Sequence, residues 1–179
     1  IAASIHGLGS GVFMALYMVV VIDALGLGPG LVGFIIGAGG LGAALGALVV
    51  GPLRARLGTA RAIVMAFGVG VAFDFAVPLS LIIPEFAVPL LLLAQLLGDG
   101  FITAFLILAL SVRQGRMPQA RLGRVNATFE LFGGGAVVIG AMIAAWLVLL
   151  LPVAAVAWGP ALAGPVAFAV LVGLVRQEI

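Results

Sequence analysis

The sequence contains no cysteine, a single histidine and no lysine. Without cysteine, disulfide bonds, thiolate chemistry and cysteine-based metal sites are excluded. With His6 as the only histidine, neither a metal-ligand cluster nor a Ser-His-acid arrangement can be assembled. The glycine-rich stretch 26–30 lacks the Lys and the preceding strand that a phosphate-binding loop requires, which argues against direct coupling to ATP. We therefore expect a protein that is not an enzyme and that uses no cofactor.

Charged residues are also scarce, at 8% of the 179 residues, whereas 65% are hydrophobic. The mean hydropathy is +1.42. A soluble domain of this size could not hide so much apolar surface in one core, so the composition indicates an integral membrane protein embedded in a lipid bilayer. Basic residues outnumber acidic ones by only 8 to 6, and no polar domain presents them. Binding to nucleic acid is therefore not expected.

Six apolar spans, each about long enough to cross a bilayer, follow one another along the chain. They lie at about residues 2–25, 31–53, 62–83, 86–112, 125–150 and 155–175. The sequence thus predicts an all-α integral membrane fold of six transmembrane helices. No signal peptide is visible before the first span, and we expect the chain to be part of something longer.

Arginine is distributed very unevenly among the segments between the spans. The polar stretch 111–126 alone carries four of the eight. All of them fall in the second loop, the fourth loop or the C-terminal tail, at Arg54, Arg56, Arg61, Arg113, Arg116, Arg121, Arg124 and Arg176. The positive-inside rule places that side of the membrane, and with it both ends of the chain, in the cytoplasm. Asp23 and Glu85 then mark the outer face.

Two acidic residues fall near the centre of the predicted bilayer. Asp74 and Asp99 each lie about twelve residues into consecutive spans, and at 1.5 Å per residue both reach the middle of the membrane. A charged group at that depth costs about 2.5–3.5 kcal/mol. One interpretation is a proton-binding site, with Gln95 one turn from Asp99. The other is a pair of neutral carboxyl groups that are hydrogen-bonded in a wet cavity and take no part in coupling.

Other polar and aromatic residues are open to two interpretations each. Glu130, less than two turns past Arg124, either forms a salt bridge that closes an inner gate or is a solvated acid. His6 is expected to be a packed or interfacial residue rather than a proton relay. Tyr17 is expected to be a packing residue or an interfacial anchor.

Small residues recur on the second span at intervals of three and four, at Gly33, Gly37, Gly40, Ala44, Ala47 and Gly51. A helix that is nearly bare of side chains along one stripe allows close approach of another helix. Tight packing and a sliding surface for a moving helix are both compatible with this pattern.

The stretch LGLGPGLVGFIIGAGGLGAALGALVVGPLRARLGTAR, residues 25–61, resembles the paired helices and loop of the major facilitator superfamily. That loop reads Gly, any, Leu, Ala, Asp, Arg, any, Gly and then basic residues, and Gly51, Leu53, Arg56 and Gly58 match it in register. Arg61 follows closely. Ala55 stands where the motif has its Asp, a departure that is expected of the copy in the C-terminal half of these transporters.

The stretch VRQGRMPQARLGRVNATFELFGGGAVVIGA, residues 112–141, is similar to the loop and eleventh helix of one branch of that superfamily, which includes the enterobactin exporter and macrolide efflux pumps. The likeness rests on Arg113-Gln114, Pro118, Gly123-Arg124 and Asn126-Ala127.

This resemblance implies that the six spans are helices seven to twelve of a twelve-helix transporter in a bacterial inner membrane, arranged as two inverted three-helix repeats. The partner would be the missing N-terminal half. The function implied is proton-coupled efflux of a small, partly apolar compound such as a drug or a siderophore, by alternating access.

Two other functions remain open. An intramembrane aspartyl protease also needs two Asp residues at similar depth on neighbouring helices. Its second signature has Gly three positions before the Asp, however, where this chain has Leu96. The third hypothesis is a membrane remnant that packs in the bilayer and transports nothing.

Overall fold

A computed structural model describes residues 2–176 of the chain. Within that range it contains helices and turns and no strand. Six helices are long and apolar enough to cross a membrane, which confirms the six predicted spans. A membrane-spanning backbone must satisfy its own hydrogen-bonding groups, and a helix does so within one segment.

Several of the six spanning helices are built from more than one helical element. The first consists of α1 (Ala2–Met18) and the π-helical η1 (Val19–Ala24), the second of α2 (Pro29–Leu57), and the third of α3 (Thr59–Ala72), the 3₁₀ turn η2 (Phe73–Phe75) and α4 (Ala76–Ile82). The fourth consists of the 3₁₀ turn η3 (Pro84–Phe86), α5 (Ala87–Leu93), the π-helical η4 (Ala94–Gly98) and α6 (Asp99–Arg116). The fifth is α7 (Gln119–Leu147), and the sixth consists of α8 (Val153–Val156) and α9 (Trp158–Arg176).

Turn residues end the helices where the sequence indicates. Gly26 has a φ of 66°, and Pro29 occupies the first turn of α2, where its missing N–H would have no partner in any case. Pro118 and Pro152 immediately precede α7 and α8. In η1 the amide of Leu25 donates to the carbonyl of Val20, five residues back, at 2.9 Å, so this helix is locally wider than an α-helix.

The helices extend further at their basic ends than the predicted spans do. α2 continues through Arg54 and Arg56 to Leu57, and α7 begins at Gln119 instead of about residue 125. The polar stretch 111–126 is therefore mostly helical, with a short break at Met117 and Pro118. Hydropathy marks where the apolar side chains stop, whereas a helix can continue into water.

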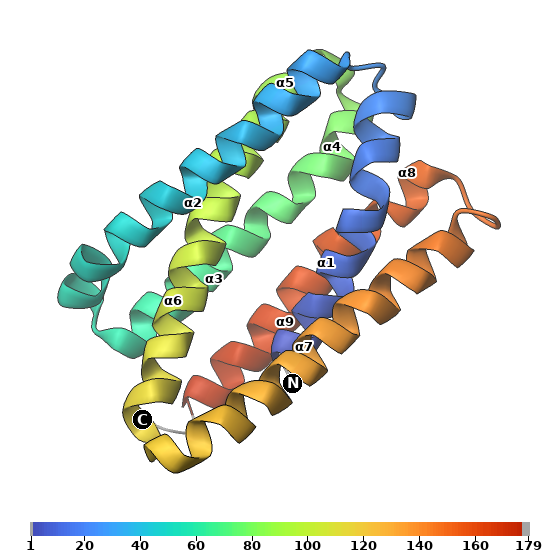
Figure 1. Cartoon of the computed structure of the whole chain (residues 1–179). Coiled ribbons are helices and arrows are strands. Elements are labelled where there is room, and N and C mark those ends of the chain that lie inside the picture. Colours follow the sequence, from blue (N-terminus) through green and yellow to red (C-terminus); the bar gives the residue numbers. More distant parts are fainter. Residues whose placement is uncertain (1, 177–179) are drawn as a thin grey trace.

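The helices form two groups that lie side by side (Figure 1). In one group α1 packs along α7 and against α9, and in the other α6 packs against α2 and α3. Contacts between α3 and α9 join the two groups. α6 and α7 are consecutive in the chain yet make few contacts with each other.

Glycines allow close backbone contact where helices cross. A Cβ added at Gly46 of α2 would meet the backbone of Gly100 in α6, and one at Gly42 would meet the carbonyl oxygens of Gln95 and Leu96. α1 and α7 cross in the same manner, because a Cβ at Gly11 would meet the carbonyl of Val137. Of the two interpretations of the stripe that begins at Gly33, tight packing is not found among the helices that the structure describes. All six residues of that stripe are exposed, and α2 packs instead through the adjacent stripe that contains Gly42 and Gly46.

Gly58 forms the whole link between α2 and α3 and has a φ of 75° with a ψ of 163°, a combination that only glycine adopts readily. We expect Gly58→Ala to lower the free energy of unfolding by about 1–3 kcal/mol. Gly51→Ala is the matched control, since Gly51 lies in the same basic region, inside the helix, with open space around its Cβ position. Denaturant titration in detergent micelles measures both variants. Equal stability of the two would contradict the strain that we assign to Gly58.

Candidate functional site

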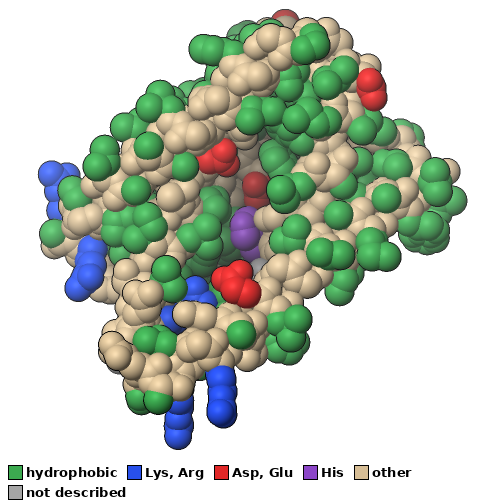
Figure 2. Space-filling model, viewed as in Figure 1, with side chains coloured by type: hydrophobic (Ala, Val, Ile, Leu, Met, Phe, Trp, Pro, Cys, Tyr) green, Lys and Arg blue, Asp and Glu red, His purple; other side chains and the backbone are tan. Residues whose placement is uncertain are grey.

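Arginine side chains mark one end of the bundle. Those that the structure describes lie around the α2–α3 and α6–α7 turns, along the left and lower edges of the molecule in Figure 2. We call this the basic end. The N-terminal end of α1 and the C-terminal end of α9 lie toward it as well (Figure 1). Asp23 and Glu85 are exposed at the opposite end. The grouping of basic residues on one side of the bundle thus agrees with the charge sorting expected from the sequence.

A hollow runs along one face of the bundle between the two groups of helices (Figure 2). Acidic side chains and the chain's only histidine, His6, line it. The His6 ring meets the edge of the Phe67 ring at a centroid distance of 5.2 Å, and its Nε2 lies 3.4 Å from the Ser10 hydroxyl. His6 is thus packed between α1 and α3, as the sequence suggested.

Asp74 and Asp99 come together inside the bundle. Asp99 begins α6 and Asp74 lies in η2, which packs against η4, the segment that ends at Gly98 beside Asp99. Both side chains are partly buried. Neither carboxylate forms a hydrogen bond or an ion pair with the part of the chain that the structure describes. Counting residues along the sequence predicted that Asp74 and Asp99 lie at the same depth in the membrane. The fold also brings them within electrostatic range of each other.

Gln95 and the backbone of α2 complete one side of this cluster. Gln95 is buried at 9% exposure. A Cβ added at Gly39 would meet a carboxylate oxygen of Asp99, and it would lie 3.1 Å from the Gln95 amide nitrogen. Glycine at position 39 is thus what leaves room for both side chains. On the other side, a Cβ at Gly164 of α9 would lie 2.9 Å from a carboxylate oxygen of Asp74.

Tyr17 is the residue of this cluster that sequence reasoning missed. It was expected to be a packing residue or an interfacial anchor, and its ring is indeed buried in the core that α1 shares with α2. Its hydroxyl oxygen, however, is buried without a hydrogen-bond partner among the described residues, and it lies within electrostatic range of Asp99. No sequence signal separates a tyrosine of this kind from an anchor, because the difference depends on which helix lies opposite. We call Tyr17, Asp74, Gln95 and Asp99 the polar cluster.

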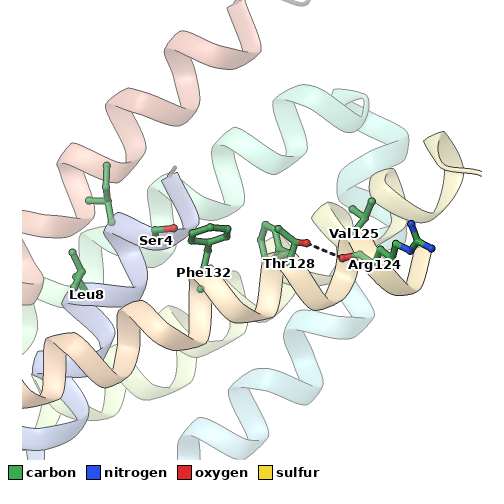
Figure 3. Close-up of a pocket in the computed structure, with 9 residues that line it drawn as sticks. Ser4, Leu8, Arg124, Val125, Thr128 and Phe132 are labelled. Atoms are coloured by element: carbon green, nitrogen blue, oxygen red, sulfur yellow. Dashed lines mark hydrogen bonds between the residues drawn. The ribbon is translucent and has the colours of Figure 1, made fainter. Parts of the chain in front are cut away.

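A cavity of about 730 Å³ lies nearer the basic end, between α1 and α7 (Figure 3). It is mainly apolar, and its lining includes Leu8, Val125, Phe129 and Phe132. Arg124 lines its rim, and the hydroxyl of Thr128 donates to the Arg124 carbonyl at 2.9 Å. A volume of this size suits a drug-sized molecule.

Arg113 connects α6 with α7 at the basic end of the hollow. Its guanidinium carbon lies 3.8 Å from the centroid of the Phe129 ring, a cation–π contact between two helices that otherwise touch little. Phe129 also lines the cavity. This contact therefore borders the cavity at the end where the sequence suggested a gate.

The remaining residues singled out from sequence lie apart from the polar cluster. Gly51, Arg56 and Gly58 are exposed around the α2–α3 turn, and Arg61 lines a second hollow of about 740 Å³ between α3 and α9. Pro118 and Gly123 are exposed around the start of α7. Glu130 is exposed and makes no ion pair with any residue in 2–176, so its role in a gate stays a prediction.

Comparison of the chain with protein-family models, with curated proteins and with solved structures finds no match.

Proposed function

We propose that this chain is the C-terminal six-helix half of a proton-coupled efflux transporter of the major facilitator type. The missing N-terminal half would be its partner in a bacterial inner membrane. The observation that carries the proposal is the polar cluster, in which two partly buried carboxyl groups lie within electrostatic range of each other in membrane-spanning helices. Neither of them forms an ion pair with a described residue. Intramembrane acids of this kind are typical of proton pathways.

The packing of the helices supports two inverted three-helix repeats. Suppose that the first spanning helix is exchanged with the fourth, the second with the fifth and the third with the sixth. The α1–α7 contact then becomes the α6–α2 contact, and the α1–α9 contact becomes the α6–α3 contact. The contact between α3 and α9 is then exchanged with itself. An inverted repeat requires this pattern, in which each contact has a counterpart. The Gly11 and Gly46 crossings are counterparts in the same sense.

The basic end supports the proposed direction of transport, and the cavity supports the proposed type of transported compound. The positive-inside rule favours a cytoplasmic basic end. The cavity near that end is lined by Phe129 and Phe132, which suits a small, partly apolar compound that enters from the cytoplasm. The exposed small residues Gly33, Gly37 and Gly40 of α2 offer a surface on which the second half could pack closely.

The test uses the full-length protein in proteoliposomes with a pH-sensitive dye inside. A panel of lipophilic drugs and siderophores is added on one side, and we expect at least one compound to drive proton movement across the membrane. Liposomes without protein serve as the control for passive leak. Absence of both proton movement and radiolabelled-compound uptake over the whole panel would contradict proton-coupled transport and favour the remnant hypothesis.

A further inference from the structure

A groove between α3 and α9 has no part in the proposed function. It is the second hollow, of about 740 Å³, and it begins at the basic end beside Ala60 and Arg61 of α3 and Val175 of α9. Among the described residues that line it, Arg61 carries the one polar side chain, and the others are apolar. We call this hollow the α3–α9 groove. Its basic mouth and its apolar walls together restrict what can fill it.

The α3–α9 groove faces away from the hollow that holds the acids. Arg61, Met65 and Gly68 recur at intervals of four and three, so they lie along one side of α3. Phe67 lies on another side of the same helix, where it is buried and contacts His6. The surfaces that we assign to the second half of the transporter lie on α1, α2 and α7. The groove is therefore left to the lipid that surrounds a membrane-spanning bundle.

The length of the groove falls within one leaflet of the bilayer. Arg61 and Gly68 are seven residues apart, which corresponds to about 10 Å along a helix. The apolar part of one leaflet is about 15 Å thick. At the inner end the ring of Phe168 packs against Gly68, where an added Cβ would lie 2.7 Å from the ring. The groove thus runs from the membrane surface into the leaflet at the basic end, where an acyl chain is the apolar group available to fill it.

The mouth of the groove attracts a negatively charged group. Arg61 is exposed and forms no ion pair with a described residue, and none of the described residues that line the groove is acidic. α3 begins two residues earlier, at Thr59, and no side chain caps its first turn, so the positive end of the helix dipole lies at the same mouth. Basic pockets between transmembrane helices bind anionic lipid head groups. A zwitterionic lipid offers the same phosphate, but its ammonium group repels the arginine.

We propose that the α3–α9 groove binds an anionic phospholipid from the leaflet at the basic end. The Arg61 guanidinium donates hydrogen bonds to the phosphate, and one acyl chain lies along Met65 and Val172 as far as the Phe168 ring. Arginine suits this role because its planar group can donate two parallel hydrogen bonds to a phosphate. The site goes beyond the proposed function, since it requires a membrane but no transported compound.

The experiment measures lipid binding to the full-length protein in mild detergent by native mass spectrometry. The probes are dioleoylphosphatidylglycerol, which is anionic, and dioleoylphosphatidylcholine, which has the same acyl chains and no net charge. We expect the first phosphatidylglycerol to bind about 5-fold more tightly, the preference that one arginine provides for an anionic lipid. Arg61→Gln should remove most of this preference. Arg56→Gln is the matched control, because Arg56 is exposed at the same turn and does not line the groove.

A second pair of variants tests whether the acyl chain lies in the groove. Val172→Trp fills the groove, and we expect it to weaken binding of both lipids about 3-fold or more, the loss expected when about one methylene group is no longer buried. Leu174→Trp is the control, since Leu174 is 46% exposed on the same helix and does not line the groove. Elution volume on size exclusion shows whether each variant is folded.

Equal binding of the two lipids to the wild-type protein would overturn the site. Equal losses in Arg61→Gln and Arg56→Gln would show that the charge of the basic end acts diffusely, and equal losses in the two tryptophan variants would show that lipid covers this surface without a specific site. If Val172→Trp keeps its lipid but changes the oligomeric state on size exclusion, protein covers the groove and the proposal is wrong. No transported compound is present in these measurements, so their outcome is independent of the proposed function.

Discussion

Replacing Gly46 with valine is expected to separate α2 from α6 and to destabilise the protein by about 3 kcal/mol or more. A Cβ at this position would meet the backbone of Gly100, including its Cα at 2.8 Å. A flexible side chain could rotate away from such an overlap, but the backbone of a packed helix cannot. The two helices would have to move apart, and the packing on both sides of the crossing would be lost. The measurement is the midpoint of unfolding in a denaturant titration in micelles.

Gly51→Val is the matched control for this prediction. Gly51 lies on the same helix, and a Cβ there would meet open space. The same change of residue type should therefore cost less than about 1 kcal/mol, the scale of helix propensity. Gly11→Val at the α1–α7 crossing should behave like Gly46→Val. Similar losses for Gly46→Val and Gly51→Val would show that the crossing does not depend on glycine.

The second large effect is expected at Asp99. Asp99→Asn keeps the size and polarity of the side chain but cannot bind or release a proton, so compound-driven proton movement should fall about 100-fold or more. Asp74→Asn should reduce it less, because the Asp74 carboxylate lies against Gly164 of α9, on the other side of the cluster from Gly39 of α2 and the Asp99 carboxylate. Proton movement is followed in proteoliposomes with equal amounts of each variant.

Asp23→Asn controls for the loss of an acid, since Asp23 is exposed at the opposite end from the arginines. Transport of the compound itself is measured in parallel. If Asp99→Asn moves protons normally and Asp74→Asn does not, the proton is carried by Asp74 and the assignment within the pair is reversed. If neither variant differs from wild type, the acids play a structural part only.

The number of spanning helices was predictable because the bilayer imposes a length on every apolar segment. The ends of these helices could not be predicted, since α2 and α7 include arginine-bearing segments that a hydropathy profile assigns to loops. The face of α2 that packs against α6 could not be predicted from the sequence either. Two adjacent stripes of that helix are rich in small residues, and only the position of α6 decides that Gly42 and Gly46 are the ones that pack.

The candidate site could also be predicted only in part. Depth along a helix follows from counting residues, so Asp74, Gln95 and Asp99 could be placed near one level from sequence. Tyr17 could not be added, because its contribution depends on facing a carboxyl group on a helix about eighty residues away in the chain. The cavity between α1 and α7 could not be predicted either, since its walls come from residues 4–8 and 124–133, which are far apart in the sequence.

The π-helical segment Ala94–Gly98 has a consequence for how this site tolerates changes in chain length. A π-helical turn holds about one residue more than an α-helical turn, so it amounts to an insertion within the fourth helix. Because the wider turn takes up this residue, α5 and α6 keep nearly the orientation that they would have in a continuous α-helix. Deleting one residue within Ala94–Gly98 would therefore restore a regular helix and leave Asp99 on nearly the same side, whereas a residue deleted from the regular part of α5 would turn α6 by about 100°. The fourth helix thus has one segment in which the chain can be shortened without turning the carboxyl group away from the polar cluster.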